Sequence, residues 1–277
     1  MKIPTNNLSK FFNLISFLFI CLDPLTGISQ DIRPSPSLQG KNIIYVYGGM
    51  EGHSPAESVD LFVPKLRAEG SSVKVFDTLS VYSDEKLMAE TDLIIQIWTD
   101  GQITEEQFNG LEKAVMNGTG LSGWHGGLGD AFRDNLKYQF MVGGQFVSHP
   151  GGMINHSIKI VNKNDPITNG IDDFDLKKTE QYYMLIDPNI KVLAISEFLK
   201  ESYEKPKKKE NKITGSSMPV IWKKNYGKGR IFYSSIGHHL TDFDVPEVMT
   251  MQMRGFRWAS EGKYMKKETT ITPIYKK

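Results

Sequence analysis

The chain has 277 residues, of which 39% are hydrophobic and 23% are charged, a balance that excludes a disordered or collagen-like protein. Its formal net charge is +1, so no overall basic field indicates nucleic-acid binding. The single cysteine, Cys21, excludes an internal disulfide framework.

Residues 1–29 are predicted to be a signal peptide. Lys2 and Lys10 are the only charged side chains before an apolar run over residues 11–22, which is shorter than the ~20 residues of a membrane-spanning helix. We therefore expect an exported protein, periplasmic or extracellular. An uncleaved membrane anchor is the alternative.

Small residues at Gly27 and Ser29 favour cleavage just after them. A lipoprotein is the less favoured alternative, because Ile20 is bulky for the position before a lipidated Cys21. Cleavage removes that cysteine, so the mature chain has no thiolate nucleophile and no Cys-ligated metal. Residues 30–40 are rich in Pro and Ser and are predicted to be an N-terminal tether.

The segment that follows predicts strands alternating with helices. Apolar, β-branched runs indicate the strands, and apolar residues at helical spacing indicate the helices. In chain order the predicted elements are a strand at 42–47, a helix opened by Ser54-Pro55 and ended by Gly70, strands at 72–76 and 92–98, a helix opened by 104–106 and a glycine-rich strand at 118–123. This order is typical of a parallel sheet covered by helices on both faces.

The second half of the chain has more strand character. Strands are predicted at 157–161, 191–195, 219–222 and 230–235, and a closing helix at 245–260. The sequence shows no internal repeat, and no segment between the two halves resembles an interdomain linker. We therefore expect one α/β domain over residues 41–262, followed by a C-terminal tail over 263–277.

Ligands of parallel α/β sheets bind beyond the carboxyl ends of the strands. Glycine-rich segments follow three of the predicted strands at those ends. They are expected to place His53, Asp100 and His125 near one edge of the sheet.

The six histidines all lie in predicted turns or at strand edges: His53, His125, His149, His156, His238 and His239. Glycine stands beside most of them and lets a ligand approach closely. Imidazole suits both proton transfer near neutral pH and metal ligation, so a group of them with one carboxylate predicts a divalent-metal site, for example for Zn²⁺. Hydrogen-bonded loop histidines are the alternative, since the sequence has neither HxH nor HExxH.

Two carboxylates are candidates for the same site. Asp100 follows a buried strand directly, and Glu180 precedes an aromatic pair on a predicted strand, whereas Asp242 and Asp244 fit turn residues better. Aromatic side chains near these turns suit the C–H faces of a sugar, although core packing explains them equally well. They are Trp98, Trp124, Tyr182, Tyr183, Trp222 and Tyr233. No nucleotide cofactor is expected, because GxGxxG and GxxxxGK[ST] are absent and Glu51 stands where a phosphate would bind.

Eight segments in register resemble the trehalose-utilisation (ThuA-like) family of the class I glutamine-amidotransferase-like superfamily. They are GGMEGHSP, DLIIQIWTDGQITEEQ, GTGLSGWHGG, VGGQFVSHPGG, NDPITNGIDDF, TEQYYM, MPVIWKKNYGKGRIFYSSIGHH and FRWAS. The resemblance implies a flavodoxin-like three-layer α/β sandwich with a mostly parallel central sheet. It also implies a role in sugar or glycoside utilisation.

The resemblance also indicates site residues. His53, His125, His149, Glu180 and His238 fall in the family's shared motifs, with Asp100 beside them. The predicted catalytic residues are His125, His149 and Glu180, and the predicted metal ligands are His125, His149 and His238. The predicted substrate-binding residues are His53, Asp100, Trp124 and Tyr182.

Two departures from the family's pattern matter. The superfamily places a nucleophilic Cys at the turn after the fourth strand, where this chain reads Ser122-Gly123-Trp124-His125, so glutamine hydrolysis is not expected. Many relatives carry an acid after the late GH, where this chain has His239, which leaves the role of that residue open.

The leading hypothesis is an exported enzyme that acts on a glycoside or keto-sugar by His/Glu acid-base or metal-assisted chemistry. The expected partner is a small carbohydrate, with a second copy of the chain or a sugar oxidoreductase as candidate protein partners. The alternative is a non-catalytic sugar-binding or partner-subunit protein of glycoside catabolism.

Overall fold

The computed structural model describes Met1, residues 36–199 and residues 213–265, so the expected signal peptide and most of the predicted tether and tail lie outside the described residues. The chain divides into two units, residues 1–35 and 36–277, and the fold belongs to the second. Within the described residues, no helix is both long and apolar enough to cross a membrane.

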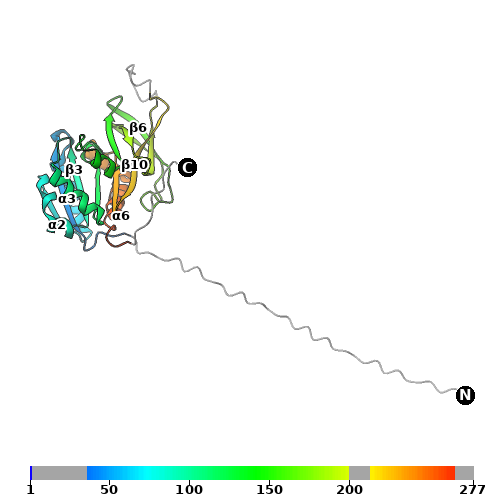
Figure 1. The fold of residues 1–277 in the computed structure, drawn as a ribbon. Helices are drawn as coiled ribbons and strands as arrows, with labels where there is room; N and C mark the ends of the chain where they lie inside the picture. The colour runs from blue at the N-terminus through cyan, green and yellow to red at the C-terminus, as the bar shows by residue number, and fades with distance from the viewer. Residues whose placement is uncertain (2–35, 200–212, 266–277) are drawn as a thin grey trace. The chain divides into compact units, whose positions relative to one another are not determined.

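One nine-stranded sheet forms the centre of the fold, in the order β2-β1-β3-β4-β11-β10-β9-β6-β7. Figure 1 labels three of its strands, β3, β10 and β6. The first five strands of the sheet pair in parallel. These strands are β2 (Ser72–Phe76), β1 (Asn42–Gly49), β3 (Leu93–Thr99), β4 (Gly120–Trp124) and β11 (Gly229–Ser234). Their carboxyl ends therefore meet at one edge of the sheet.

The remaining four strands pair antiparallel. They are β10 (Ser217–Tyr226), β9 (Lys191–Glu197), β6 (Met153–Ile160) and β7 (Phe174–Glu180). A separate two-stranded sheet joins β5 (Gly144–Ser148) to β8 (Tyr183–Ile186).

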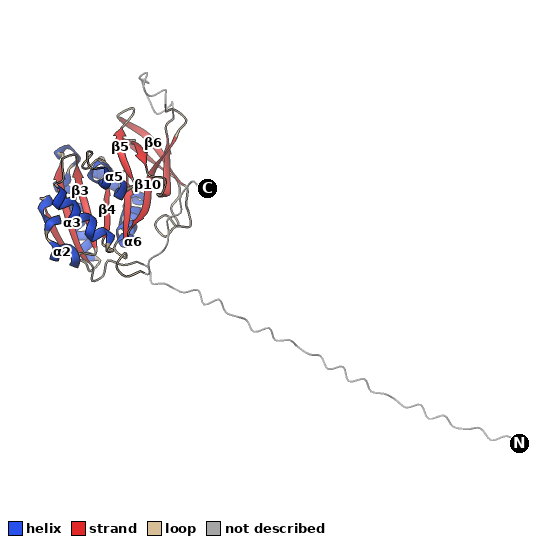
Figure 2. Cartoon of the chain, viewed as in Figure 1, coloured by secondary structure: helices blue, strands red, loops and turns tan. Residues whose placement is uncertain are grey.

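Helices cover both faces of the parallel half (Figure 2). One face carries α1 (Pro55–Ala68) and α6 (Pro246–Ala259). The other face carries α2 (Glu85–Glu90), α3 (Glu105–Met116), α4 (His125–Gly129) and α5 (Leu136–Val142). In the part of the chain that the structure describes, short 3-10 helices lie in connections at η1 (Glu51–His53), η2 (Leu79–Ser83) and η5 (Leu240–Asp244).

The alternation of side chains along β1 divides the core into two layers. Ile43 and Tyr45 pack with α1 and α6, whereas Ile44 and Val46 pack with α3 and its neighbours. A strand that is apolar on both faces is what a sheet covered on both sides requires. The predicted three-layer α/β fold is therefore confirmed, with a sheet that is parallel in its first half and antiparallel in its second.

The structure adds elements that the sequence did not predict: α2, α4, α5, β5 and the greater part of β7 and β8. His156, expected at a strand edge, lies inside β6 and is 6% exposed. The strand begins at Met153, earlier than predicted, because the part that precedes the predicted start at residue 157, MINH, has one β-branched residue, Ile154, to mark it as a strand.

Candidate functional site

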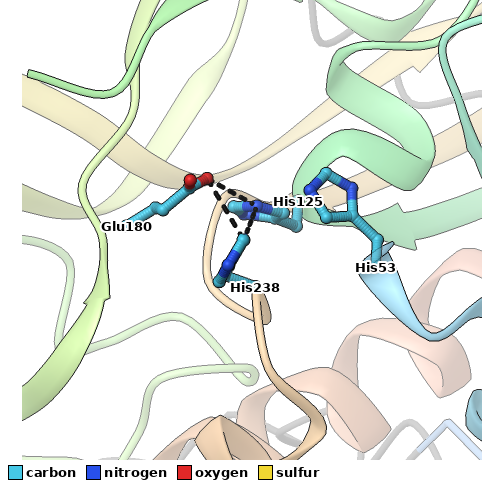
Figure 3. A group of neighbouring side chains, drawn as sticks. All are labelled: His53, His125, Glu180 and His238. Carbon is cyan, nitrogen blue, oxygen red and sulfur yellow. Dashed lines mark hydrogen bonds and ion pairs between the residues drawn. The ribbon is translucent and has the colours of Figure 1, made fainter. Parts of the chain in front are cut away.

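Three imidazoles and one carboxylate converge at the carboxyl edge of the parallel strands (Figure 3). They belong to His53, His125, Glu180 and His238, and one potential ligand atom from each lies within 4.8 Å of the others. Residues that are 185 positions apart along the chain, His53 and His238, thus share one site.

Each side chain comes from the end of a strand or the connection after it. His53 ends η1 just after β1, His125 follows β4 directly, and His238 follows β11 by a short loop. Glu180 is the last residue of β7, the edge strand of the antiparallel half. The sequence-based placement of His53 and His125 at one edge of the sheet is consistent with this geometry.

Three of the four ligand atoms form a triangle of equal sides. His125 Nε2, His238 Nδ1 and Glu180 Oε2 are 3.2 Å apart in each pair. Two ligands of a single ion with bonds of about 2.1 Å lie about 3.0 to 3.4 Å apart at octahedral or tetrahedral angles. The spacing of the triangle therefore fits one metal ion.

The hydrogen bond of His125 determines which of its nitrogens faces the cluster. His125 Nδ1 lies 2.9 Å from the carbonyl oxygen of Ser235. A carbonyl can only accept, so Nδ1 carries the proton and the lone pair of Nε2 points into the cluster. His53 Nδ1 is also hydrogen-bonded, at 2.9 Å to Thr99 Oγ1, a hydroxyl that can donate or accept.

Burial disfavours the protonated form of two imidazoles of the cluster, His53 and His125. It lowers the pKa of His125, although Glu180 opposes this effect. Burial and the neighbouring imidazoles lower the pKa of His53 to about 4. Burial raises the pKa of Glu180, but the adjoining His125 and His238 more than offset this and hold it well below its usual range. At neutral pH the ionised carboxylate of Glu180 therefore faces the neutral imidazoles of His53 and His125.

Strained backbone is concentrated around the cluster. Among the described residues, five that are not glycine have a positive φ: Ser54 (49°), Asp100 (64°), His125 (49°), Phe132 (51°) and Lys178 (49°). Ser54 adjoins His53, and Lys178 stands two residues before Glu180. Such conformations cost about 1–3 kcal/mol each and accumulate where function requires them.

Two further predicted residues flank the cluster. The Tyr182 ring stacks on the His125 ring, with centroids 4.0 Å apart and an interplanar angle of 29°. His149 Nδ1 lies 3.5 Å from Glu180 Oε1, and its side chain is 44% exposed. His149 is thus on the outer side of Glu180, while His53 takes part in the group of potential ligands.

The other predicted residues lie elsewhere. The Trp124 ring is buried in the core between Phe62 and Phe243, at centroid distances of 4.6 and 5.0 Å. Asp100 is exposed just after β3, and its backbone N–H donates to the carbonyl of Asp130. The structure does not bring either side chain into the four-residue group.

Sequence reasoning missed the residues that support the cluster. Thr99 and Ser235 hold two of the imidazoles, and Asp242, taken as a turn residue, is 6% exposed and accepts a hydrogen bond from Thr179. Ser235 lies in the YSSIGHH segment that contains His238, and Thr99 directly precedes Asp100. Their closeness in sequence to candidate site residues is the signal that could have identified them.

Comparison with known proteins identifies relatives of this fold. A family model described as trehalose utilisation (ThuA) matches residues 42–259. A ThuA-like protein of Bacteroides uniformis ATCC 8492 superposes with a TM-score of 0.67 at 19% identity, covering 84% of this chain and 95% of the other. A ThuA-like protein of Parabacteroides merdae ATCC 43184 gives 0.62 at 16% identity, covering 85% and 95%.

No curated protein matches the chain. The cytoplasmic protein STM1381 of Salmonella typhimurium LT2 superposes with a TM-score of 0.51 at 12% identity, covering 82% of this chain and all of the other. At these identities the structural likeness establishes the fold alone.

Proposed function

The chain belongs to the trehalose-utilisation (ThuA) family, and from this premise we propose that it is a metal-dependent enzyme of carbohydrate utilisation. Its site is the cluster of His53, His125, Glu180 and His238, and its substrate is a glycoside or the keto form of one. The export expected from residues 1–29 belongs to the same proposal, and N-terminal sequencing of the mature protein would test it.

One observation carries the metal proposal: the neutral form of His125 presents a lone pair, and not a proton, to the carboxylate of Glu180. His125 has its proton on Nδ1, where Ser235 accepts it, so Nε2 offers a lone pair. That lone pair lies 3.2 Å from the carboxylate oxygen Glu180 Oε2. Two acceptors at this distance repel each other unless a proton or a metal cation lies between them, and burial disfavours the second proton on His125, which favours the metal.

The donor set restricts the kind of ion. Three imidazole nitrogens and one carboxylate oxygen suit Zn²⁺, Mn²⁺, Fe²⁺ or Ni²⁺, whereas Mg²⁺ and Ca²⁺ prefer oxygen ligands. The hydrogen bonds of His53 to Thr99 and of His125 to Ser235 are the outer contacts that orient ligating imidazoles. The residues present therefore fit a transition-metal ion.

The residues around the cluster suggest separate tasks. A divalent ion held there supplies a Lewis acid for a sugar oxygen. Tyr182 fixes the plane of the His125 ring by stacking on it. His149 is accessible, and with its Nδ1 towards Glu180 it presents Nε2 to an incoming sugar.

His149 is therefore our candidate for the general base. A carbonyl in a keto-sugar acidifies the neighbouring C–H bond, and His149 Nε2 takes that proton. The electron pair of the C–H bond forms a C=C bond as the C–O bond to the leaving group breaks. His149 then returns the proton to the departing oxygen, so one sugar leaves as an unsaturated ketone and the other group as an alcohol.

The test measures metal content and turnover in the same samples of purified protein. We expect about one transition-metal ion per chain in the wild type and its loss in His125→Ala, His238→Ala and Glu180→Gln, because each removes a ligand. His239→Gln is the matched control, since His239 is exposed and lies outside the group of ligands. A metal-free wild type, or ligand variants that keep full metal content, would contradict the proposal.

Turnover is then screened with glycosides and their keto forms. We expect His149→Gln to keep the metal and the bound sugar but to lose at least ~100-fold in rate, as a missing general base predicts. If the wild type binds sugars without converting any, the protein is a binding module and the catalytic part of the proposal is wrong.

A further inference from the structure

We propose that Thr179 and Asp242 are positioning residues that fix the distance between Glu180 and His238. The inference rests on the metal site proposed above. It assigns a role to a buried contact behind that site, which none of the cluster residues makes directly.

The contact joins the two segments that supply Glu180 and His238. Thr179, the neighbour of Glu180 on β7, donates from Oγ1 to Asp242 Oδ2 at 2.7 Å. The same carboxylate oxygen accepts from the backbone N–H of His239, the neighbour of His238, at 3.4 Å. One oxygen atom therefore links the residue beside one proposed ligand to the residue beside another.

The sheet itself does not provide this link. Among the described strands β7 is an edge strand whose one partner is β6, and His238 lies in the loop between β11 and η5. The distance between Glu180 Oε2 and His238 Nδ1, 3.2 Å, thus depends on contacts outside the strand ladder. The hydrogen bonds of Asp242 to Thr179 and to the backbone of His239 are contacts of this kind, because each partner directly adjoins one of the two proposed ligands.

The backbone before Glu180 is also shaped for this arrangement. The pairing of β6 with β7 shifts register between Ile154 and His156, and Lys178 opposite has a φ of 49°. Asn155 Oδ1 accepts from the backbone N–H of Lys178 at 2.9 Å. Bulges of this kind redirect the side chains that follow them, and here Glu180 follows two residues later.

A role in turn formation alone does not account for Asp242. An Asp that caps a turn is normally solvated, whereas Asp242 is 6% exposed and its partner Thr179 is 1% exposed. Burying a carboxylate costs free energy unless hydrogen bonds compensate for it. The buried carboxylate of Asp242 accepts a hydrogen bond from Thr179, beside Glu180, and a second one from the backbone of His239, beside His238. These two hydrogen bonds compensate for its burial and link the two segments.

The experiment titrates the metal-free full-length protein with Co²⁺ alone and follows the visible absorption, which reports coordination geometry. Thr179→Val keeps the shape of the side chain and removes the hydroxyl. We expect it to weaken Co²⁺ binding roughly 10- to 100-fold, the usual effect of losing an outer-shell partner, and to change the spectrum. Thr179→Ser keeps the hydroxyl and should restore both.

Thr119→Val is the matched control. Thr119 is 1% exposed and donates from Oγ1 to the carbonyl of Thr91 at 2.9 Å, at the amino end of β4, opposite to His125. Both valine variants lose one buried hydrogen bond, so both should lower the melting temperature of the metal-free protein by a similar amount. Only Thr179→Val should affect the metal.

The outcomes separate this inference from the proposed function. If the wild type binds Co²⁺ and Thr179→Val binds it as tightly with the same spectrum, the positioning role is wrong and the metal site stands. If the wild type does not bind Co²⁺, both are wrong. Should Thr179→Val fail to fold, Asp242→Ala takes its place, with the same loss of affinity expected and an unchanged affinity overturning the inference.

Discussion

The backbone and side-chain conformation of His125 is fixed by contacts on several sides. Its φ of 49° is costly for a residue with a side chain, yet three contacts hold it: Ser235 accepts from the ring, Tyr182 stacks on it, and Tyr233 donates to its carbonyl at 3.1 Å. The turn after β4 therefore presents an imidazole nitrogen to the cluster.

His156 predicts how stability depends on pH. Burial lowers its pKa to about 4, against about 6.5 in an unfolded chain. His156 binds a proton less readily in the folded state than in the unfolded state. It therefore makes no unfavourable contribution above pH ~6.5, and the free energy of unfolding falls as the pH drops from there towards ~4. Between pH ~7 and pH ~4.5 the loss from this one residue should be about 2–3 kcal/mol.

The measurement is urea unfolding of the metal-free protein at both pH values, for the wild type and for His156→Gln. Other buried histidines titrate in the same direction, so the difference between the two proteins isolates His156. The variant should lose about 2–3 kcal/mol less than the wild type over this range. Equal losses would show that His156 is protonated as easily in the folded state as in the unfolded one.

At the scale of elements, the sequence predicted those whose signals are local. The helix opened by residues 104–106 is α3, where Thr104 and Gln107 form a capping box and apolar residues recur at helical spacing. By contrast α4, with the sequence HGGLG, contains three glycines and has little helix propensity of its own. Its conformation is set by packing against β3 and β4, which no local pattern reveals.

The same limit applies to the candidate site. The sequence selected His125, Glu180 and His238 from their neighbours and residue types. It could not tell that His53 would join them while His149 lies outside, because that depends on where the edge strand β7 ends in space. Pairing over many residues of chain, rather than local propensity, decides such positions.

The first turn of α4 gives a prediction at this scale. A Cβ on Gly126 would lie 2.8 Å from Thr99 Cγ2 and 3.0 Å from His53 Cε1, too close on both sides. Gly126→Ala should therefore displace His53 and weaken metal binding about 10-fold or more, as measured by calorimetric titration. Gly52→Ala is the control, since a Cβ there meets nothing within 4 Å although it adjoins His53. Equal affinities in the two variants would mean that His53 is not needed as a ligand.

At the scale of the whole fold, the cluster joins the two halves of the sheet. His53, His125 and His238 follow strands of the parallel half, and Glu180 ends the far edge strand of the antiparallel half. Four strands separate β4 from β7 in the sheet order, yet their ends meet. β6 pairs with β9 at Lys159 and Ile160 and with β7 from Met153 to Ile158, so the end of β7 that carries Glu180 lies beyond the pairing of β6 with β9.

A metal bound at this junction should therefore stabilise the fold as a unit. An ion that binds only the folded chain adds about 4 kcal/mol when its free concentration is about 1,000 times its dissociation constant. For a domain of this size each kcal/mol raises the melting temperature by roughly 2–4 °C, so we expect an increase of roughly 8–16 °C in calorimetry with metal relative to EDTA. Glu180→Gln removes the ligand from the antiparallel half and should abolish most of this increase. An equal increase in that variant would show that the ion binds elsewhere, and that the two halves of the sheet are held together without it.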